Sequence, residues 1–276
     1  MGILEAILLG ILQGLTEFLP ISSTAHLTIA GHLLGLINME QPQQWTAFLA
    51  VVQMGTLAAV LVYFAKDIAG ITSDFLKQAV IRRQSFAHWT LNARLGWWII
   101  VGSIPIGVVG LAAKKLIEGH LTKDPVVIGS ALIGLAVVLW IAEKLARFTK
   151  DLAQIRAKEA LTVGVAQVFA LIPGASRSGT TITGGLLVGL KRDVAARFSF
   201  LLSIPAVFAS GVLEFWQLVD QVPGDQLFNV AVATAAAALS GYAAIAFLLS
   251  YLRTHTTMVF VVYRIVLGAL VIGLLS

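Results

Sequence analysis

Two polar clusters interrupt otherwise apolar stretches of this 276-residue chain, and both contain groups that could carry chemistry. The first cluster holds Glu17 and the second holds Arg177. A charged group inside an apolar stretch of membrane length is costly, so each is a functional candidate. The alternative is one structural ion pair, which would not require the neighbouring hydroxyls: Ser22, Ser23 and Thr24 near Glu17, and Ser176, Ser178, Thr180 and Thr181 near Arg177.

The second cluster predicts a phosphate-binding site. It reads Pro173-Gly-Ala-Ser-Arg-Ser-Gly-Thr-Thr181, with hydroxyls on both sides of the arginine. A guanidinium offers bidentate donors, and a helix that begins here adds free amides and the positive end of its dipole. For any single hydroxyl, capping or bridging a helix is the commoner role. We expect these residues to bind phosphate oxygens: Thr24, Ser176, Arg177, Ser178 and Thr181.

The first cluster predicts a cation site and a proton-transfer group. Gln13 and Glu17 are four residues apart, on one helix face, and a carboxylate with an amide oxygen suits a hard divalent cation. Ser23 and His26 are three apart on the next helix, where a serine can attack and a histidine can transfer a proton. A buried structural histidine is the alternative. Together the clusters predict metal-assisted phosphoryl transfer, with Ser23 or a water as nucleophile.

Composition places both clusters in a single-domain, all-α polytopic membrane protein over residues 1–276. Hydrophobic residues make up 58% of the chain and charged residues 12%, with a mean hydropathy of +0.90; soluble domains carry about 25% charged residues. There is no cysteine, which excludes disulfides and thiolate chemistry. Six stretches are long enough to cross a bilayer: 45–65, 91–113, 125–147, 195–219, 227–251 and 256–275.

The clusters also occupy corresponding places in an internal repeat, about 1–148 and about 155–276. Each copy would be a broken, re-entrant helical hairpin followed by three transmembrane helices, so the second copy is inverted relative to the first. Broken helices at such a repeat interface form binding sites. Chance recurrence of glycine and proline is the alternative. The matches are Gly10 and Gln13 with Gly164 and Gln167 at an offset of 154, Pro20 and Ser23 with Pro173 and Ser176 at 153, and 31–36 with 185–190 at 154.

The distribution of basic residues predicts the orientation. If both hairpins return to their own sides, one side of the membrane receives thirteen lysines and arginines, in links 66–90, 144–160, 191–197 and 252–257. The other side receives three, Lys114, Lys115 and Lys123. By the positive-inside rule the basic side is cytoplasmic, so both termini face outward. This asymmetry accounts for the net charge of +5, and no nucleic-acid partner is expected.

Both motifs resemble those of the undecaprenyl pyrophosphate phosphatases, also called bacitracin-resistance proteins. The Glu/Gln-x-x-x-Glu motif of that family stands here as Gln13-Gly-Leu-Thr-Glu17, and its Pro-Gly-x-Ser-Arg-Ser-x-x-Thr motif stands at 173–181. The stretch 18–26 is similar to the family segment that carries an important histidine. The resemblance extends to motif order, length and hydropathy. It implies functional roles for Glu17, Ser23, His26, Ser176 and Arg177, with Gln13 where other members have glutamate.

The resemblance implies a hydrolase of the bacterial inner membrane that removes the terminal phosphate from undecaprenyl pyrophosphate. The product is the lipid carrier recycled for peptidoglycan synthesis, and abundance of the enzyme confers bacitracin resistance. The resemblance also implies dependence on Mg²⁺ or Ca²⁺ and an active site open to the periplasmic face. Because glutamine replaces glutamate at position 13, one anionic ligand is missing. We interpret Glu17 and Gln13 as the residues that hold the cation, and its full set of ligands stays open.

Three further points stay open at this stage. The sequence does not determine the oligomeric state, and a homodimer is among the states that it allows. A transporter or flippase of a phosphorylated polyprenyl lipid is the alternative function, because inverted repeats with broken helices are also a transporter architecture. Gln53 and Arg264 lie within spans and are candidates for the cavity wall, although a structural role is equally expected for Arg264. In either function, a long polyprenyl tail requires a lateral opening between helices.

Overall fold

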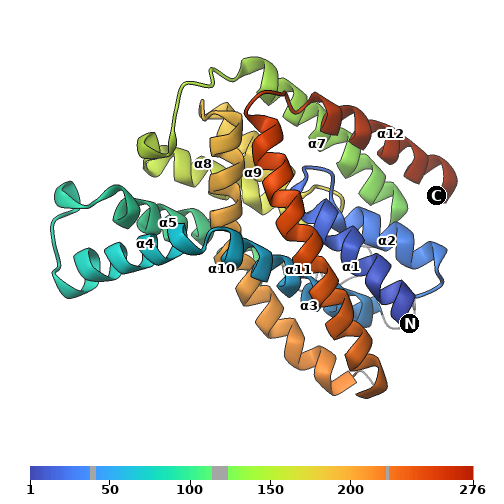
Figure 1. Ribbon diagram of the computed structural model, residues 1–276. Helices are drawn as coiled ribbons and strands as arrows, with labels where there is room; N and C mark the ends of the chain where they lie inside the picture. The colour runs from blue at the N-terminus through green and yellow to red at the C-terminus, as the bar shows by residue number, and fades with distance from the viewer. Residues whose placement is uncertain (38–41, 114–123, 222–223, 276) are drawn as a thin grey trace.

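The computed structural model describes residues 1–37, 42–113, 124–221 and 224–275 (Figure 1). The regular structure of these residues is helical, apart from one isolated bridge between Lys150 and Leu190. Within these described ranges, five helices are long and apolar enough to cross a membrane, and a shorter apolar helix covers Met258–Leu274. These six agree with the six predicted spans: α3 (Pro42–Tyr63), α5 (Leu91–Ala112), α7 (Pro125–Leu145), α10 (Arg192–Gln221), α11 (Gly224–Leu252) and α12 (Met258–Leu275).

Two pairs of short helices occupy the two interrupted stretches. The first pair is α1 (Ile3–Phe18) and α2 (Ser23–Leu33), and the second is α8 (Ala157–Val168) and α9 (Arg177–Leu187), with a 3₁₀ turn at Phe169–Leu171. The longest, α1, has 16 residues, which is about 24 Å at the usual helical rise. Since the hydrocarbon core is about 30 Å thick, none of these helices is long enough to cross it alone.

Both breaks end in the same local structure. Ser22 caps α2 with φ 74°, and Ser176 caps α9 with φ 67°, so both serines are in the left-handed region. Each hydroxyl accepts a hydrogen bond from an amide three residues later, at 3.3 Å from Ala25 and 3.2 Å from Gly179. The structure thus pairs Ser22, rather than Ser23, with Ser176, and the offset of 154 continues through the break without a gap.

Packing between the halves follows a reciprocal pattern. Helix α1 packs on α11 and α8 packs on α5, while α3 contacts α10 and α7 contacts α12. Gly10 and Gly164 show why glycine stands at these crossings, because an added Cβ would overlap the carbonyl of Ala233 or Gly102, respectively. Small residues at helix crossings let backbones approach closely in membranes. The two short pairs are therefore fixed against long helices at equivalent positions.

A polar network lies where α7 ends. The buried carboxylate of Glu143 accepts hydrogen bonds from Arg192 Nε at 2.7 Å and Thr257 Oγ1 at 2.8 Å. Lys150 Nζ pairs with Glu159 Oε1 at 2.6 Å, at the start of α8. Nearby, the hydrogen bond and ion pair with Asp151 raise the pKa of Lys191. This network ties both ends of the α8–α9 pair to the link after α7, and so sets where the second break lies.

The remaining elements lie away from the two breaks. Helix α4 (Ala65–Phe75) continues directly from α3, leads into a π-helical turn at Leu76–Ile81, and projects from the body beside α5 (Figure 1). Short 3₁₀ turns cover Phe86–His88 and Leu152–Gln154. Lys114, Lys115 and Lys123, which the orientation prediction assigns to the less basic side, lie outside the described residues.

Candidate active site

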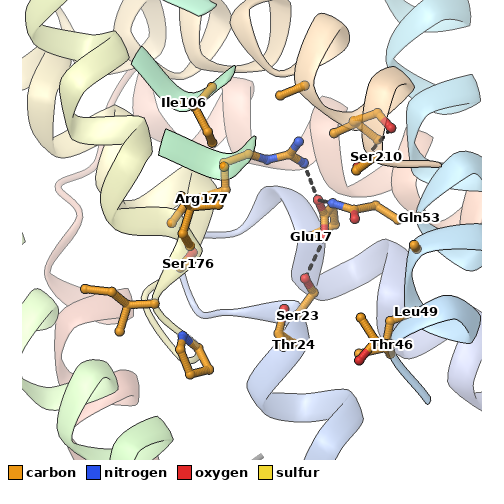
Figure 2. Close-up of a pocket in the computed structure, with 18 of the residues that line it drawn as sticks. Glu17, Ser23, Thr24, Thr46, Leu49, Gln53, Ile106, Ser176, Arg177 and Ser210 are labelled. Atoms are coloured by element: carbon orange, nitrogen blue, oxygen red, sulfur yellow. Dashed lines mark hydrogen bonds and ion pairs between the residues drawn. The ribbon is translucent and has the colours of Figure 1, made fainter. Parts of the chain in front are cut away.

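The carboxylate of Glu17 lies at the centre of the site, at the end of α1 (Figure 2). Its Oε2 accepts hydrogen bonds from Gln13 Nε2 at 3.0 Å and Ser23 Oγ at 2.5 Å. Its Oε1 accepts from Gln53 Nε2 at 2.7 Å and from Arg177 Nη2. All four partners donate, which matches the acceptor-only chemistry of an ionised carboxylate. The Glu17 side chain is only 3% exposed, so these bonds are shielded from water.

The two breaks lie together, as expected for broken helices at the interface of the predicted repeat. The Arg177–Glu17 ion pair joins the start of α9 to the end of α1. A second link is the hydroxyl of Ser178, which donates to the carbonyl oxygen of Leu19 at 3.0 Å. Residues 160 positions apart thus meet at one point. The spanning helix α3 contributes Gln53, which donates to Glu17. The prediction that Gln53 lines the cavity is confirmed.

A cavity of about 550 Å³ adjoins the ion pair. This volume is within the range of ligand pockets. Predicted site residues on its wall are Glu17, Ser23, Thr24, Ser176 and Arg177, and the rest of the wall is largely apolar, from α3, α5, α10 and the loop 170–174 (Figure 2). The starts of α2 and α9 both border the cavity, so two helix N-termini direct their positive ends toward one space.

Two of the predicted phosphate ligands do not lie on the cavity wall. The hydroxyl of Ser178 bonds the carbonyl of Leu19 and approaches the hydroxyl of Ser176 at 3.2 Å. Thr181 is fully buried, and its Oγ1 lies 2.7 Å from the Arg177 carbonyl oxygen and 2.5 Å from Ser199 Oγ. Because α9 begins at Arg177, Thr181 is one helical turn further on, at the contact with α10. Both hydroxyls hold the break in shape.

His26 lies on a different face of α2. Its Nδ1 is 2.7 Å from the carbonyl oxygen of Ser22, and its Nε2 is 2.6 Å from the hydroxyl of Tyr263 in α12. A carbonyl can only accept, so Nδ1 carries a proton, and in the neutral imidazole Nε2 then accepts from the tyrosine hydroxyl. The two rings are nearly parallel, at 5°. In this arrangement the nitrogens of His26 bond Ser22 and Tyr263, and its role in proton transfer stays a prediction.

Arg264 supports the second break from α12. It is fully buried, and its Nη2 donates to the carbonyl of Ala175 at 2.9 Å and to those of Gly174 and Ala131 at 3.4 Å. A Cβ added at Gly179 would lie 2.7 Å from Arg264 Nη1, which explains the glycine in the motif. The sequence left a structural and a site role open, and the contacts assign Arg264 to holding the backbone that presents Arg177.

Comparison with known proteins assigns the family. A model of the family described as bacitracin resistance protein BacA matches residues 6–270. The chain belongs to this family. The resemblance inferred from the motifs is thus confirmed, and the two BacA-family motifs are the segments that meet at the cavity.

Curated members of the BacA family are similar over nearly their whole length. A protein of Syntrophobacter fumaroxidans named undecaprenyl-diphosphatase is 55% identical over 268 residues, covering 97% of this chain and 95% of the relative. The protein of that name from Myxococcus xanthus is 51% identical, covering 100% and 90%. The one from Chloroherpeton thalassium is 50% identical, covering 100% and 98%.

Proposed function

We propose that this BacA-family protein hydrolyses undecaprenyl pyrophosphate to undecaprenyl phosphate and inorganic phosphate. The observation that carries the proposal is the meeting of both family motifs, through Glu17 and Arg177, at one cavity among membrane-spanning helices. Relatives with about half of their residues identical bear the name of this activity. The lipid product is then available for another round of cell-wall synthesis, and high activity of the enzyme confers resistance to bacitracin.

The cavity provides a place for the pyrophosphate. Arg177 and the amides at the starts of α2 and α9 are donors for phosphate oxygens. Because Arg177 is paired with Glu17, an entering phosphate competes with that carboxylate for the guanidinium. Thr24 and Ser176 add hydroxyls on the same wall. Substrate binding thus exchanges an internal ion pair for an ion pair with the substrate.

The geometry supports Glu17 as a base. Ser23 Oγ donates to Glu17 Oε2 at 2.5 Å, so the carboxylate is placed to take the proton of the nucleophile. In the serine route, Ser23 Oγ bonds the terminal phosphorus and the bond from that phosphorus to the bridging oxygen breaks. Undecaprenyl phosphate leaves, and a water then releases inorganic phosphate from the serine. In the water route, a water beside Ser23 attacks directly and gives its proton to Glu17.

The donor set fits a divalent cation that is shared with the substrate. In the described part of the chain, no group of three or more His, Cys, Asp or Glu side chains could hold a metal ion by itself. Glu17 is one carboxylate with the amides of Gln13 and Gln53 beside it, and Mg²⁺ is commonly held by one or two carboxylates plus substrate phosphates. Glu17 with Gln13 would hold Mg²⁺ or Ca²⁺, which would supply charge neutralisation at the transferred phosphoryl group.

We infer that the α1–α2 and α8–α9 pairs are re-entrant hairpins in an inverted repeat. Four observations support this: the short helices, the matching caps at Ser22 and Ser176, the equivalent glycine crossings at Gly10 and Gly164, and the reciprocal helix contacts. The broken backbone lies against protein and a polar cavity, which is where irregular backbone is tolerated at membrane depth.

The orientation follows from the same arrangement. By the positive-inside rule, the basic links favour a position of the ends of α3 and α7 on the cytoplasmic side of the bacterial inner membrane. The cavity wall includes Trp45 near the start of α3 and Leu111 near the end of α5, so the cavity opens on the opposite, periplasmic side. Both chain ends lie on the side of the molecule opposite to the projecting α4–α5 pair (Figure 1), which supports placing both termini on one side of the membrane.

Phosphate release from undecaprenyl pyrophosphate by the purified protein in detergent tests the function. We expect release that falls with a chelator and in the variants Arg177→Ala and Ser23→Ala. Ser210→Ala is the matched control, because Ser210 lines the same cavity but its hydroxyl bonds its own helix at Val207. If folded wild-type protein binds the lipid without releasing phosphate, transport becomes the better explanation. If Ser23→Ala alone retains near-normal release, the serine route is wrong and water attacks.

A further inference from the structure

The cavity beside Glu17 is too small for a complete polyprenyl pyrophosphate. At about 550 Å³ it has the size that encloses a drug-sized ligand. A pyrophosphate and the first isoprene units fill such a space, so most of an undecaprenyl tail must lie outside it. The surface along which the tail leaves the cavity is therefore part of the binding site.

A second hollow lies next to the cavity, at the loop between α8 and α9. It is a shallow groove of about 570 Å³ on the outer face of α7. Ile172, which is 42% exposed, lines both the cavity and the groove, so the two hollows are neighbours. None of the described residues that line it is charged; these are Val126, Val127, Ser130, Ala131, Gly134, Leu135, Val138 and Ile172.

We propose that this α7 groove binds the polyprenyl tail of the lipid whose pyrophosphate occupies the cavity, an assignment that rests on the proposed function. Ala131 and Gly134 share one helix face, and these small residues form the bottom of the groove. No described atom lies within 4 Å of a Cβ added at Gly134. The exposed side chains of Val126 and Val138 flank it along α7. A branched apolar chain fits this surface, whereas a charged ligand would find no oppositely charged side chain among the described residues that line it.

The groove contributes more by positioning the polyprenyl tail than by hydrophobic affinity for it. In a bilayer, lipid tails are as apolar as the groove, so burial from water provides no driving force and packing remains. Tail contacts that fix the chain along α7 also fix the direction from which the pyrophosphate enters the cavity, and orientation of the reacting group raises turnover. The groove should therefore favour long polyprenyl pyrophosphates over short ones.

A second copy of this chain is the competing occupant. Ser130 and Gly134 are four residues apart on an exposed helix face, which is the spacing of small residues in packed membrane helices. One observation favours the lipid tail: the groove and the cavity share Ile172 in their linings, so the groove lies beside the space that holds the pyrophosphate in the proposed function.

Filling the groove with a large side chain tests the proposal. Gly134→Trp starts from an exposed position at which a Cβ meets no described atom within 4 Å. Val137→Trp is the matched control, since Val137 is on the same helix, is 39% exposed and does not line the groove. We expect Gly134→Trp to lower kcat/KM about tenfold for undecaprenyl pyrophosphate and to leave farnesyl pyrophosphate almost unchanged, with little effect of Val137→Trp on either.

Equal losses on the long and short substrates, no loss on the long one, or the same loss in Val137→Trp would overturn the assignment. Light scattering of the wild type and Gly134→Trp in detergent adds a further criterion. A dimer that the tryptophan converts to a monomer would assign the groove to a second copy instead.

A binding measurement separates this proposal from the proposed function. A photoreactive side chain in place of Gly134 or Val137 is irradiated with undecaprenyl pyrophosphate, and the cross-linked peptide is identified by mass spectrometry. We expect a lipid adduct at 134 and little at 137. An adduct at 134 without phosphate release would refute the phosphatase activity and retain the groove, whereas release without that adduct would refute the groove alone.

Discussion

Replacing Glu17 with glutamine tests whether one carboxylate holds the two helix breaks together. The amide has the same shape, but it offers one acceptor oxygen to four donors and carries no charge for Arg177. Ser23 can rotate its hydroxyl and Gln13 can turn its amide, so the main loss is the ion pair. Breaking a buried pair costs about 3–5 kcal/mol, and the 16% exposure of the Arg177 side chain places this one near the lower figure, about 3 kcal/mol.

Thermal unfolding in detergent measures the effect. A loss of about 3 kcal/mol lowers the Tm by about 6 °C, at roughly 2 °C per kcal/mol for a chain of this size. Glu5→Gln is the control, because Glu5 is in the same helix and its carboxylate accepts from the backbone amide of Gly2. The double variant Glu17→Gln with Arg177→Met should lose about 1–3 kcal/mol less of the free energy of unfolding than the two single variants lose together.

Two results would refute the reasoning. A Tm for Glu17→Gln within about 1 °C of the wild type would mean that the ion pair contributes nothing to holding the breaks together. Strict additivity in the double variant would mean that Glu17 and Arg177 act independently, and their contact would then be incidental to stability.

Three further predictions concern the supports of the site. Gly164→Leu should reduce the free energy of unfolding by about 1–3 kcal/mol or more, and so lower the Tm, because its Cβ overlaps α5. Gly107→Ala is the control, since its Cβ meets no described atom within 4 Å, and it should leave the Tm unchanged. Equal Tm values for the two variants would contradict the close crossing. Tyr263→Phe removes the donor to His26 and should cost about 1 kcal/mol in the same assay; an unchanged Tm would argue against that bond. Arg264→Met should lower kcat with little change in KM, because Arg264 positions the backbone before Arg177; a change confined to KM would instead indicate contact with the substrate.

Local sequence determined the helices and the placement of the polar groups along them. Long apolar runs became α3, α5, α7, α10, α11 and α12, because a run of that length satisfies its backbone as a helix in the membrane. Proline and hydroxyl clusters stopped the helices at 18 and 168, so the two broken pairs were predictable. The internal repeat also predicted that the two breaks would meet, because broken helices lie together at the interface of such a repeat, and an ion pair between Glu17 and Arg177 was the alternative interpretation of the two charges.

Only the tertiary structure decided which way the side chains point. Spacing put Ser23 and His26 one helical turn apart on α2, yet Ser23 bonds Glu17 at the cavity while His26 bonds Tyr263, 237 residues away. In the same way, Thr181 is part of the motif but lies against Ser199 in α10. The direction of a side chain depends on the residue at which its helix begins and on the helix packed against that face, and neither is contained in local spacing.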